Sequence, residues 1–168
     1  CLDRVPPEPW PVVQDTLRRS LGRPLNTLFS EISAEPLASA SIAQVYAARA
    51  RDEGGVERDL VIKVQRQRLP ERVDADMRIL GFGAELLQKV PTLRNGNPRG
   101  MVRQFDQTIH EELDFLREAQ NLEEFNRIML ALGRTDVCAP RHVPALTTRE
   151  VLTMERFRGF RVDDLEKM

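Results

Sequence analysis

Two apolar stretches at the start of the chain have the spacing of helices. In residues 11–22 the apolar side chains recur with a helical period, between Pro11 at a first helical position and Gly22 after the last turn. These apolar residues are Val12, Val13, Leu17 and Leu21. Residues 24–32 predict a second, shorter helix.

The pattern then changes to one that is typical of β-strands. Residues 37–51 are mostly small, β-branched or aromatic, and the sequence DEGG at 52–55 is a turn signal. Extended structure resumes over 60–65. The order is strand, a loop of alanines and serines, strand, turn and strand, which predicts a meander of antiparallel strands.

The middle of the chain returns to a helical period. Residues 70–90 predict a helix whose apolar positions are Val73, Met77, Leu80, Ala84 and Leu87. Prolines and an Asn-Gly-Asn sequence make 91–98 a loop. A long helix is expected over 101–132, and the following residue, Gly133, is expected to end it.

The last part of the chain predicts two more strands, over 143–146 and 151–155, around the turn residues 147–150. Residues 162–165 have the pattern of another helix start, with acidic residues in the first turn. The expected fold class is therefore α+β, with a five-stranded antiparallel sheet.

The composition fits one ordinary globular domain. The 168 residues are 41% hydrophobic and 30% charged, which is enough for a domain with a core. The net charge is −1 and acidic residues are interleaved with the arginines, so the charges predict a solvated mixed surface and no nucleic-acid partner.

Cysteine and histidine give no sign of a metal centre. Cys1 and Cys138 form no C-x-x-C pair, and His110 and His142 form no ligand cluster, so no metal ligands and no disulfide framework are expected. A reducing compartment fits best. No apolar run approaches the ~18–20 residues that span a bilayer, so we expect no membrane-spanning segment in this sequence and no signal peptide at its start. The first residue is not Met, and we expect a fragment of a longer protein.

The candidate chemistry begins with the loop of alanines and serines. Residues 38–45 (ASASIAQV) have the spacing of a kinase glycine-rich loop, G-x-G-x-x-G-x-V, with alanine for each glycine. Lys63 follows Val45 by eighteen residues in the sequence LVIK, which is similar to the kinase V-A-I-K. Such a loop covers ATP phosphates with backbone N–H groups, and the lysine pairs with the phosphates. Each alanine Cβ narrows the allowed backbone and hinders close approach to a phosphate.

Two carboxylates of the long helix lie on faces that otherwise look buried. Glu112 shares one face with Phe105, Ile109, Leu113 and Leu116. Glu118 shares another face with Phe115, Leu122, Phe125 and Met129. Burying a carboxylate costs free energy unless it is paired or hydrogen-bonded, so each of these two is expected to pair with a cation. Lys63 is the natural candidate.

Simpler interpretations stay open for these residues. The apolar stripes are ragged, so Glu112 and Glu118 can both lie at an edge with their carboxylates in water. A lysine in an edge strand is often only solvated. What favours a nucleotide site is the order of loop, lysine and helical acid in one chain.

In these segments the sequence resembles the UbiB family of atypical kinases, also called aarF-domain-containing kinases. The matching segments are PLASASIAQVYAAR at 36–49, LVIKVQR at 60–66, EELDFLREAQNLEEF at 111–125 and REVLTMERFRG at 149–159. The opening LDRVPPEPW and the run PRHVPALTT at 140–148 are also similar to this family. The resemblance covers nearly the whole chain.

The resemblance implies a protein-kinase-like fold, of which this chain is the N-terminal lobe with the family's helical insertions. The expected parts are a helical extension (1–34), three strands with the alanine-rich loop (35–66), a helical insertion (67–104), the long helix (105–133), and two strands with the hinge and the start of the C-terminal lobe (134–168). The family's K-x-G-Q motif is expected upstream of Cys1. The C-terminal lobe, with its catalytic Asp and Asn and its D-F-G sequence, is expected after Met168.

The resemblance also assigns residues to catalysis. Lys63 matches the strand lysine that contacts the phosphates, and Glu118 matches the helix glutamate that pairs with this lysine. Glu112 and Asp114 match the family's E-x-D motif. The residues expected to act in catalysis are Lys63, Glu118, Glu112 and Asp114.

A second group is assigned to the nucleotide. The family motif A-A-A-S corresponds to ASAS at 38–41, so this chain departs from it at one position, Ser39. By analogy two valines sandwich the adenine, although both can also be plain sheet core, and the backbone of the hinge holds the adenine edge. The residues expected to bind the nucleotide are Ala38, Ser39, Ala40, Ser41, Val45, Val61, Lys63, Met154, Glu155 and Phe157.

For function, the resemblance implies ATP and ADP as ligands, with Mg²⁺ held by the C-terminal lobe. The parent is expected to be an atypical kinase or ATPase linked to ubiquinone or other isoprenoid lipids. It is expected on the cytoplasmic side, peripheral to a bacterial inner membrane, or in a mitochondrion or plastid, with an isoprenoid lipid or a membrane surface as partner. This fragment alone is expected to be inactive. Two alternatives stay open: a nucleotide-gated lipid-binding or chaperone-like pseudokinase without phosphoryl transfer, and a mixed domain with no catalytic role.

Overall fold

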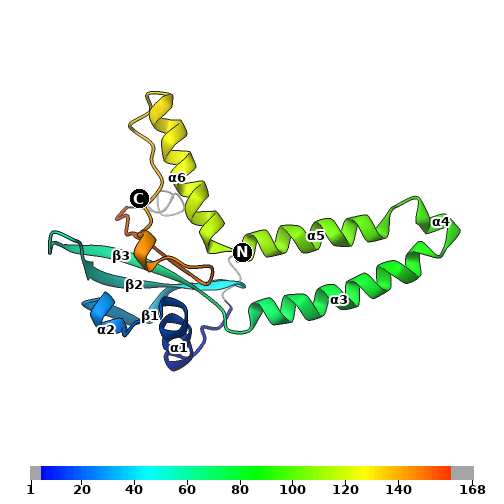
Figure 1. Ribbon diagram of the computed structural model, residues 1–168, viewed down its shortest axis with the longest axis horizontal. Coiled ribbons are helices and arrows are strands. Elements are labelled where there is room, and N and C mark those ends of the chain that lie inside the picture. The colour runs from blue at the N-terminus through cyan, green and yellow to red at the C-terminus, as the bar shows by residue number, and fades with distance from the viewer. Residues whose placement is uncertain (1–4, 160–168) are drawn as a thin grey trace, which may run out of the picture.

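The structure is a computed structural model that describes residues 5–159, and it combines a twisted sheet with a projecting helical hairpin (Figure 1). Its helices are α1 (Trp10–Leu21), α2 (Leu25–Leu28), α3 (Leu69–Gln88), α4 (Pro91–Arg94), α5 (Pro98–Leu113), α6 (Phe115–Ala131) and the 3-10 turn η1 (Pro144–Leu146). Its strands are β1 (Glu31–Ser39), β2 (Ala43–Arg51), β3 (Glu57–Gln65) and β4 (Val151–Glu155). The expected α+β class is confirmed. The helix expected over 162–165 lies outside the described residues.

The sheet is antiparallel throughout, in the order β1-β2-β3-β4. The prediction of five strands is wrong, since the described residues form a sheet of four. The expected additional strand forms η1 instead, and only His142 makes a β-bridge, to Met154. The Val143 N–H still donates to the Thr153 carbonyl at 2.8 Å, but Pro144 has no N–H with which to continue the ladder.

The N-terminal elements agree with the predicted ones in part. The helix expected over 11–22 is α1, and Gly22 ends it with a left-handed φ of 64°. The helix expected over 24–32 is only the single turn α2, because β1 already begins at Glu31 and pairs with β2. Pro36 is tolerated in β1 because this strand lies at the edge of the sheet, and the pairing register shifts on both sides of it.

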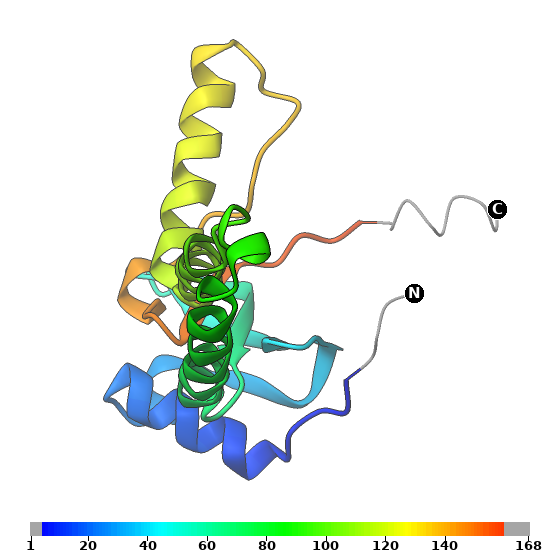
Figure 2. The same ribbon diagram turned by 90° about the vertical axis from the view of Figure 1, so that its right-hand side faces the viewer.

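One face of the sheet is packed against α1, and we call it the closed face. Partners in an antiparallel ladder point to the same side, so Tyr46, Ile62 and Thr153 form a row across three strands. All three are fully buried. The core on this side consists of Val13, Leu17, Phe29, Tyr46, Ala48, Ala50, Leu60, Ile62, Val64, Leu146 and Val151. Figure 2 shows α1 on this side of the sheet and α6 rising from the other.

The opposite face is covered at one end only, and we call it the open face. Its covered end is a small cluster in which Ala43 and Leu152 pack against Phe115 and Ala119 of α6. The next positions of the face are half-buried rather than buried. In register, the open face carries the rows Ala38, Val45, Lys63, Leu152 and Ala47, Val61, Met154.

The long helix expected over 101–132 is two helices, and Asp114 separates them. Its φ and ψ of −93° and 97° are extended, and its side chain caps α6 by accepting the Leu116 N–H at 3.0 Å. The Gln65 side-chain amide donates to the Leu113 carbonyl at 2.8 Å, and the Phe115 N–H donates to the Arg149 carbonyl at 3.1 Å. These bonds take the groups that a continuous helix would pair internally, so α6 starts in a new direction.

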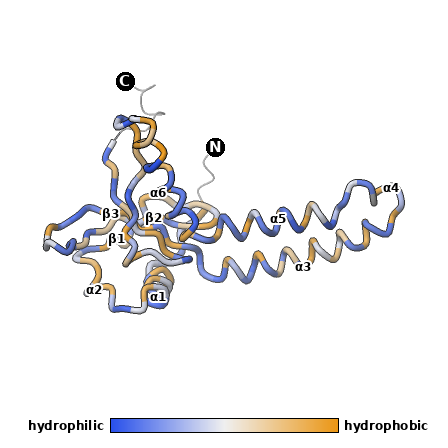
Figure 3. Tube along the Cα trace, turned by 45° about the horizontal axis from the view of Figure 1, so that its top comes forward, coloured by the Kyte–Doolittle hydropathy of each residue, from blue (hydrophilic) through white to orange (hydrophobic). Residues whose placement is uncertain are grey.

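The helix expected over 70–90 is α3, and together with α4 and α5 it forms a hairpin that projects from the sheet (Figure 1). Of α3, only Ala84 is fully buried. Apolar positions recur along the hairpin (Figure 3). The large apolar residues exposed on it are Ile79, Leu80, Phe82, Leu86, Leu87, Val90, Leu93, Met101 and Phe105. Within residues 5–159, no helix is long and apolar enough to cross a bilayer.

Candidate functional site

The centre of the candidate site is an ion pair on the open face. Lys63 of β3 places its Nζ 2.6 Å from Oε2 of Glu118 in α6. The side chains are 21% and 36% exposed, so water screens the pair only in part. The Lys63 ammonium also lies 4.7 Å from the ring centroid of Phe115, which is fully buried. The ammonium is therefore held in one place by a carboxylate and an aromatic ring, with part of its surface still accessible.

The structure brings four of the predicted nucleotide residues onto the same face as this lysine. Ala38 and Val45 lie in the row of Lys63, while Val61 and Met154 lie in the next row. Val45, Val61 and Met154 are half-buried. An apolar platform next to a fixed cation suits a ligand with a flat apolar part and a negative part.

The alanine-rich loop connects β1 to β2 at the edge of this platform. Ala38 and Ser39 are the last residues of β1, and Ala40, Ser41 and Ile42 make the turn. The Ala40 N–H donates to the Ala43 carbonyl at 2.9 Å. Within residues 5–159, the non-glycine residues with positive φ are Arg68 and Asn97, neither of which is in this loop. The loop therefore does not need glycine for its backbone, which explains how alanines fit here.

The two acidic residues of the E-x-D motif do different things. Asp114 caps α6, and its carboxylate lies 3.6 Å from Nε of Arg149. Glu112 is exposed, and its carboxylate makes no hydrogen bond or ion pair with another residue within 5–159. The prediction that Glu112 lies on a buried face is wrong, because α5 leads away from the sheet and leaves Phe105 of the same stripe 51% exposed. The same prediction holds in part for Glu118, which is half-buried and paired.

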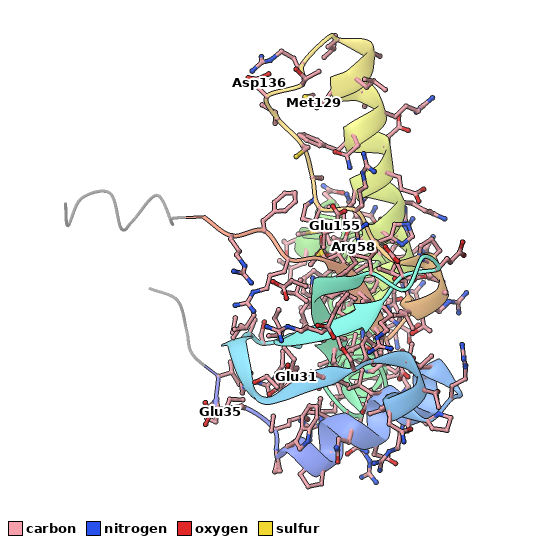
Figure 4. The ribbon with its side chains drawn as sticks, turned by 90° about the vertical axis from the view of Figure 1, so that its left-hand side faces the viewer. Glu31, Glu35, Arg58, Met129, Asp136 and Glu155 are labelled. Atoms are coloured by element: carbon pink, nitrogen blue, oxygen red, sulfur yellow. The ribbon has the colours of Figure 1, made fainter. Side chains whose placement is uncertain are left out.

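The predicted hinge follows the end of β4. The Glu155 N–H donates to the Arg141 carbonyl at 2.9 Å, so the backbone of Glu155 has only its carbonyl left for a ligand. Phe157 is 55% exposed. A hollow of about 1040 Å³ opens beside this segment, and Arg58 and Glu155, which Figure 4 labels, line it from β3 and β4. The hollow does not include Lys63.

Another hollow, of about 740 Å³, lies between α3, α5 and the start of α6, also apart from Lys63. Its notable group is His110, whose Nδ1 lies 2.8 Å from the Asp106 carbonyl and whose Nε2 lies 3.0 Å from the Asp74 carboxylate. These two acceptors raise the pKa of His110 above its usual value, because both ring nitrogens are best satisfied as donors. The contact joins the two long helices of the hairpin.

Sequence reasoning missed two residues that shape the site. Phe115 was expected only as part of an apolar helical face, but its ring lies against the Lys63 ammonium. Gln65 is buried and holds the end of α5 at the sheet through the Leu113 carbonyl. No local pattern marks either role, since each depends on a partner about fifty residues away.

A four-stranded antiparallel sheet with a lysine on one face, paired to a glutamate of the helix that packs at one end of that face, is the arrangement of a kinase-like N-terminal lobe. The chain belongs to the ABC1 atypical kinase-like family, since the model of the ABC1 atypical kinase-like domain matches residues 1–168. The resemblance to the UbiB and aarF kinases is thereby confirmed.

Relatives and a solved structure agree with this family. An uncharacterized, chloroplastic aarF domain-containing protein kinase of Arabidopsis thaliana is 35% identical over 170 residues, covering 100% of this chain and 31% of that protein. The probable protein kinases UbiB of Xanthomonas oryzae and Aliivibrio fischeri are 35% and 32% identical, each covering 99% of this chain and 30% of the relative. The structure of Rv3197 with erythromycin, from Mycobacterium tuberculosis, matches with a TM-score of 0.67 at 25% identity, covering 96% of this chain and 39% of that one. The chain thus spans about 30% of the length of the curated relatives it matches.

Proposed function

We propose that this chain is the ATP-binding N-terminal lobe of a longer atypical kinase or ATPase. The observation that carries the proposal is the Lys63–Glu118 pair, 2.6 Å long, at the edge of the half-buried apolar platform of the open face. A kinase needs such a pair because phosphoryl transfer depends on placing and neutralising phosphate charge.

The roles of the residues follow from their places on the open face. The adenine ring lies on Val45 and Val61, with Met154 at its edge and the Glu155 carbonyl as its acceptor. The phosphates reach Lys63, whose ammonium offers a charge-assisted hydrogen bond. Glu118 and Phe115 keep that ammonium in place before the nucleotide arrives, which lowers the cost of ordering it.

The E-x-D residues serve the same site from a distance. Asp114 sets the start of α6 and thereby the position of Glu118, which lies one turn further along that helix. The Glu112 carboxylate is exposed near the end of α5, where the hairpin meets the sheet. We propose that it pairs with a segment outside the described residues. We propose that the helical insertion extends to Leu113, because residue 104, where it was expected to end, lies inside α5.

Magnesium does not fit the described residues by themselves. Nowhere in 5–159 do three side chains of His, Cys, Asp or Glu converge as a metal site requires. We propose that Mg²⁺ is held by the nucleotide phosphates and by residues outside this chain, so no step is assigned to the metal here. By the same reasoning the 168-residue chain alone does not turn over ATP.

Replacing Lys63 in the full-length protein tests the proposal. Lys63→Ala is expected to lower the steady-state rate of ATP hydrolysis by about tenfold or more, because a charge-assisted phosphate contact is lost. Arg58→Ala is the matched control, since Arg58 is an exposed cation of the same strand that pairs with Asp52. An unchanged rate in Lys63→Ala, or an equal loss in Arg58→Ala, contradicts the proposal.

The helical hairpin favours a second candidate, a nucleotide-gated module that binds an isoprenoid lipid or a membrane surface. Residues 86–105 contain four basic residues, Lys89, Arg94, Arg99 and Arg103, and no acidic residue. The same stretch exposes Leu86, Leu87, Val90, Leu93, Met101 and Phe105. Apolar side chains beside basic ones suit the interface of an anionic bilayer, and of these basic residues Arg99 also pairs with Glu85 of α3 at 3.0 Å. On this candidate the protein works at a membrane surface, and ATP binding moves the hairpin without making a phosphorylated product.

Liposome sedimentation separates the two candidates. Binding of the full-length protein to vesicles with anionic lipid, weakened by Lys89→Glu and changed by ATP with no phosphorylated product, favours the second candidate. ATP turnover into a phosphorylated lipid, or hydrolysis that is indifferent to vesicles, favours the first. An isoprenoid lipid added to the vesicles tests the proposed lipid class in the same assay.

A further inference from the structure

Arg66 connects the alanine-rich loop to the strand that carries Lys63. It follows β3 directly, three residues after Lys63, and is half-buried. Its backbone N–H donates to the Ile42 carbonyl at 3.0 Å. Its Nε donates to the Ala40 carbonyl at 2.9 Å, and one of its terminal nitrogens donates to the Ser39 hydroxyl, also at 2.9 Å. One residue thus bonds to Ala40 and Ile42 of the loop and to Ser39 at the end of β1.

The same guanidinium reaches a third segment of the chain. Its terminal nitrogen also donates to the Pro6 carbonyl at 3.0 Å. Two residues further on, Glu8 is held to the sheet by a reciprocal pair of bonds with Gln44. The Glu8 N–H donates to Oε1 of Gln44 at 2.9 Å, and Nε2 of Gln44 donates to the Glu8 carboxylate at 3.3 Å. Arg66 therefore joins the loop both to the end of β3 and to the N-terminal segment, which Glu8 in turn joins to β2.

The Ser39 hydroxyl that Arg66 contacts sits where the family motif has its second alanine. An alanine side chain has no acceptor, so the bond from Arg66 to Ser39 is an addition of this chain. The bond from Arg66 to the Ala40 carbonyl needs only backbone and does not depend on the side chain. Replacing alanine by serine at position 39 changes the size of the side chain little, but it adds a hydrogen bond to Arg66.

We propose that Arg66 is a positioning residue for the nucleotide: its guanidinium holds the alanine-rich loop at the edge of the open face before ATP binds, and the Ser39 hydroxyl strengthens this hold. This inference rests on the proposed function. Its physical basis is that a loop ordered in advance loses less conformational entropy when it meets a ligand. The planar guanidinium has several N–H donors and can bond the Ala40 carbonyl, the Pro6 carbonyl and the Ser39 hydroxyl at once. The single ammonium of a lysine cannot match this geometry.

The test uses the full-length protein with four variants, Arg66→Ala, Arg66→Lys, Ser39→Ala and the control Arg68→Ala. Arg68 is exposed and lies two residues further along the chain. Arg66→Ala is expected to raise the dissociation constant for MgATP by about fivefold to tenfold, with a smaller change in kcat, because two charge-assisted bonds that order the loop are lost. Arg66→Lys does not restore binding, Ser39→Ala has about a twofold effect, and Arg68→Ala matches the wild type.

A second measurement keeps the inference separate from the proposed function. Amide hydrogen exchange of residues 40–43 without nucleotide is expected to be faster in Arg66→Ala and unchanged in Arg68→Ala. If the wild type binds MgATP and Arg66→Ala binds it equally well, Arg66 does not position the nucleotide. If exchange in the loop is the same in wild type and Arg66→Ala, Arg66 does not hold the loop. If the wild type binds no MgATP while exchange changes as expected, the hold on the loop stands and the proposed function fails.

Discussion

The two faces of the sheet are built from alternating residues of the same strands, yet they differ in what they do. On the closed face Tyr46 and Ile62 are fully buried against α1. On the open face Val45 and Val61 are half-buried, and Lys63 carries a charge there. Because the apolar core lies on the closed face, the open face is free to hold a partly exposed ion pair and an apolar platform. The apolar core and the proposed nucleotide site are thus carried by alternating residues of the same strands.

The largest effect that this comparison predicts is on stability, from neighbouring residues of β3. Ile62→Ala removes a fully buried side chain of the closed face and is expected to lower the free energy of unfolding by about 2–5 kcal/mol. Val61→Ala removes a half-buried one on the open face and is expected to cost about 1 kcal/mol or less. Native-state hydrogen exchange of the β2 and β3 amides in the full-length protein measures both. Equal losses in the two variants would show that the faces do not differ as described.

The second effect concerns α6, whose first turns pack on one end of the open face. Asp114→Ala removes the side-chain cap of α6 and is expected to destabilise this helix by about 1 kcal/mol. Asp114→Asn is the matched control, because asparagine also caps helices. Amide exchange in the first turns of α6 is the measurement. Faster exchange in both variants alike would mean that the Asp114 charge near Arg149, and not the cap, holds the helix start.

The smallest predicted effect lies outside both faces, in the hairpin. The pKa of His110 is raised by the Asp106 carbonyl and the Asp74 carboxylate, so the folded hairpin favours the protonated ring. The resulting stabilisation is complete below the ordinary histidine pKa of about 6.5 and is lost as the pH rises through the raised value. Asp74→Asn is expected to weaken protection of α3 and α5 amides at pH 5.5 more than at pH 8.5. A difference between wild type and variant that stays constant over this range would exclude His110 as its source.

The parts of this fold that follow from local pattern could be predicted from the sequence. The apolar period between Pro11 and Gly22 predicts α1, and the alternating segments around the Gly-Gly turn predict β2 and β3. The pairing of Lys63 with Glu118 could also be predicted. A carboxylate on an apolar helical face is expected to pair with a cation, and the family resemblance identifies Lys63 as that cation. For α1, β2 and β3 the deciding information lies within one element, whereas the pairing of Lys63 with Glu118, 55 residues apart in the sequence, rests on the family resemblance.

The parts that depend on distant contacts could not be predicted. The spacing of apolar residues continues through Asp114, and only the bonds from Gln65 and to Arg149 end α5 there. Glu112 belongs to an apolar stripe that stays in solvent, since α5 departs from the sheet. The expected fifth strand fails at Pro144, where the pattern of apolar residues is strand-like but the hydrogen-bond donor is missing. The contacts of Arg66 with the loop likewise join residues whose spacing in the sequence carries no signal.

The central claim is that nucleotide binds to the open face and not elsewhere on the sheet, and valine methyl NMR of the full-length protein tests it most directly. Val45 and Val61 lie on the open face, whereas Val64 and Val151 lie in the core of the closed face. Addition of MgATP is expected to shift the methyl signals of Val45 and Val61 strongly and those of Val64 and Val151 little, and Lys63→Ala is expected to require more nucleotide for the same shifts. Unchanged Val45 and Val61 signals at saturating MgATP, or equal shifts on both faces, would contradict the account.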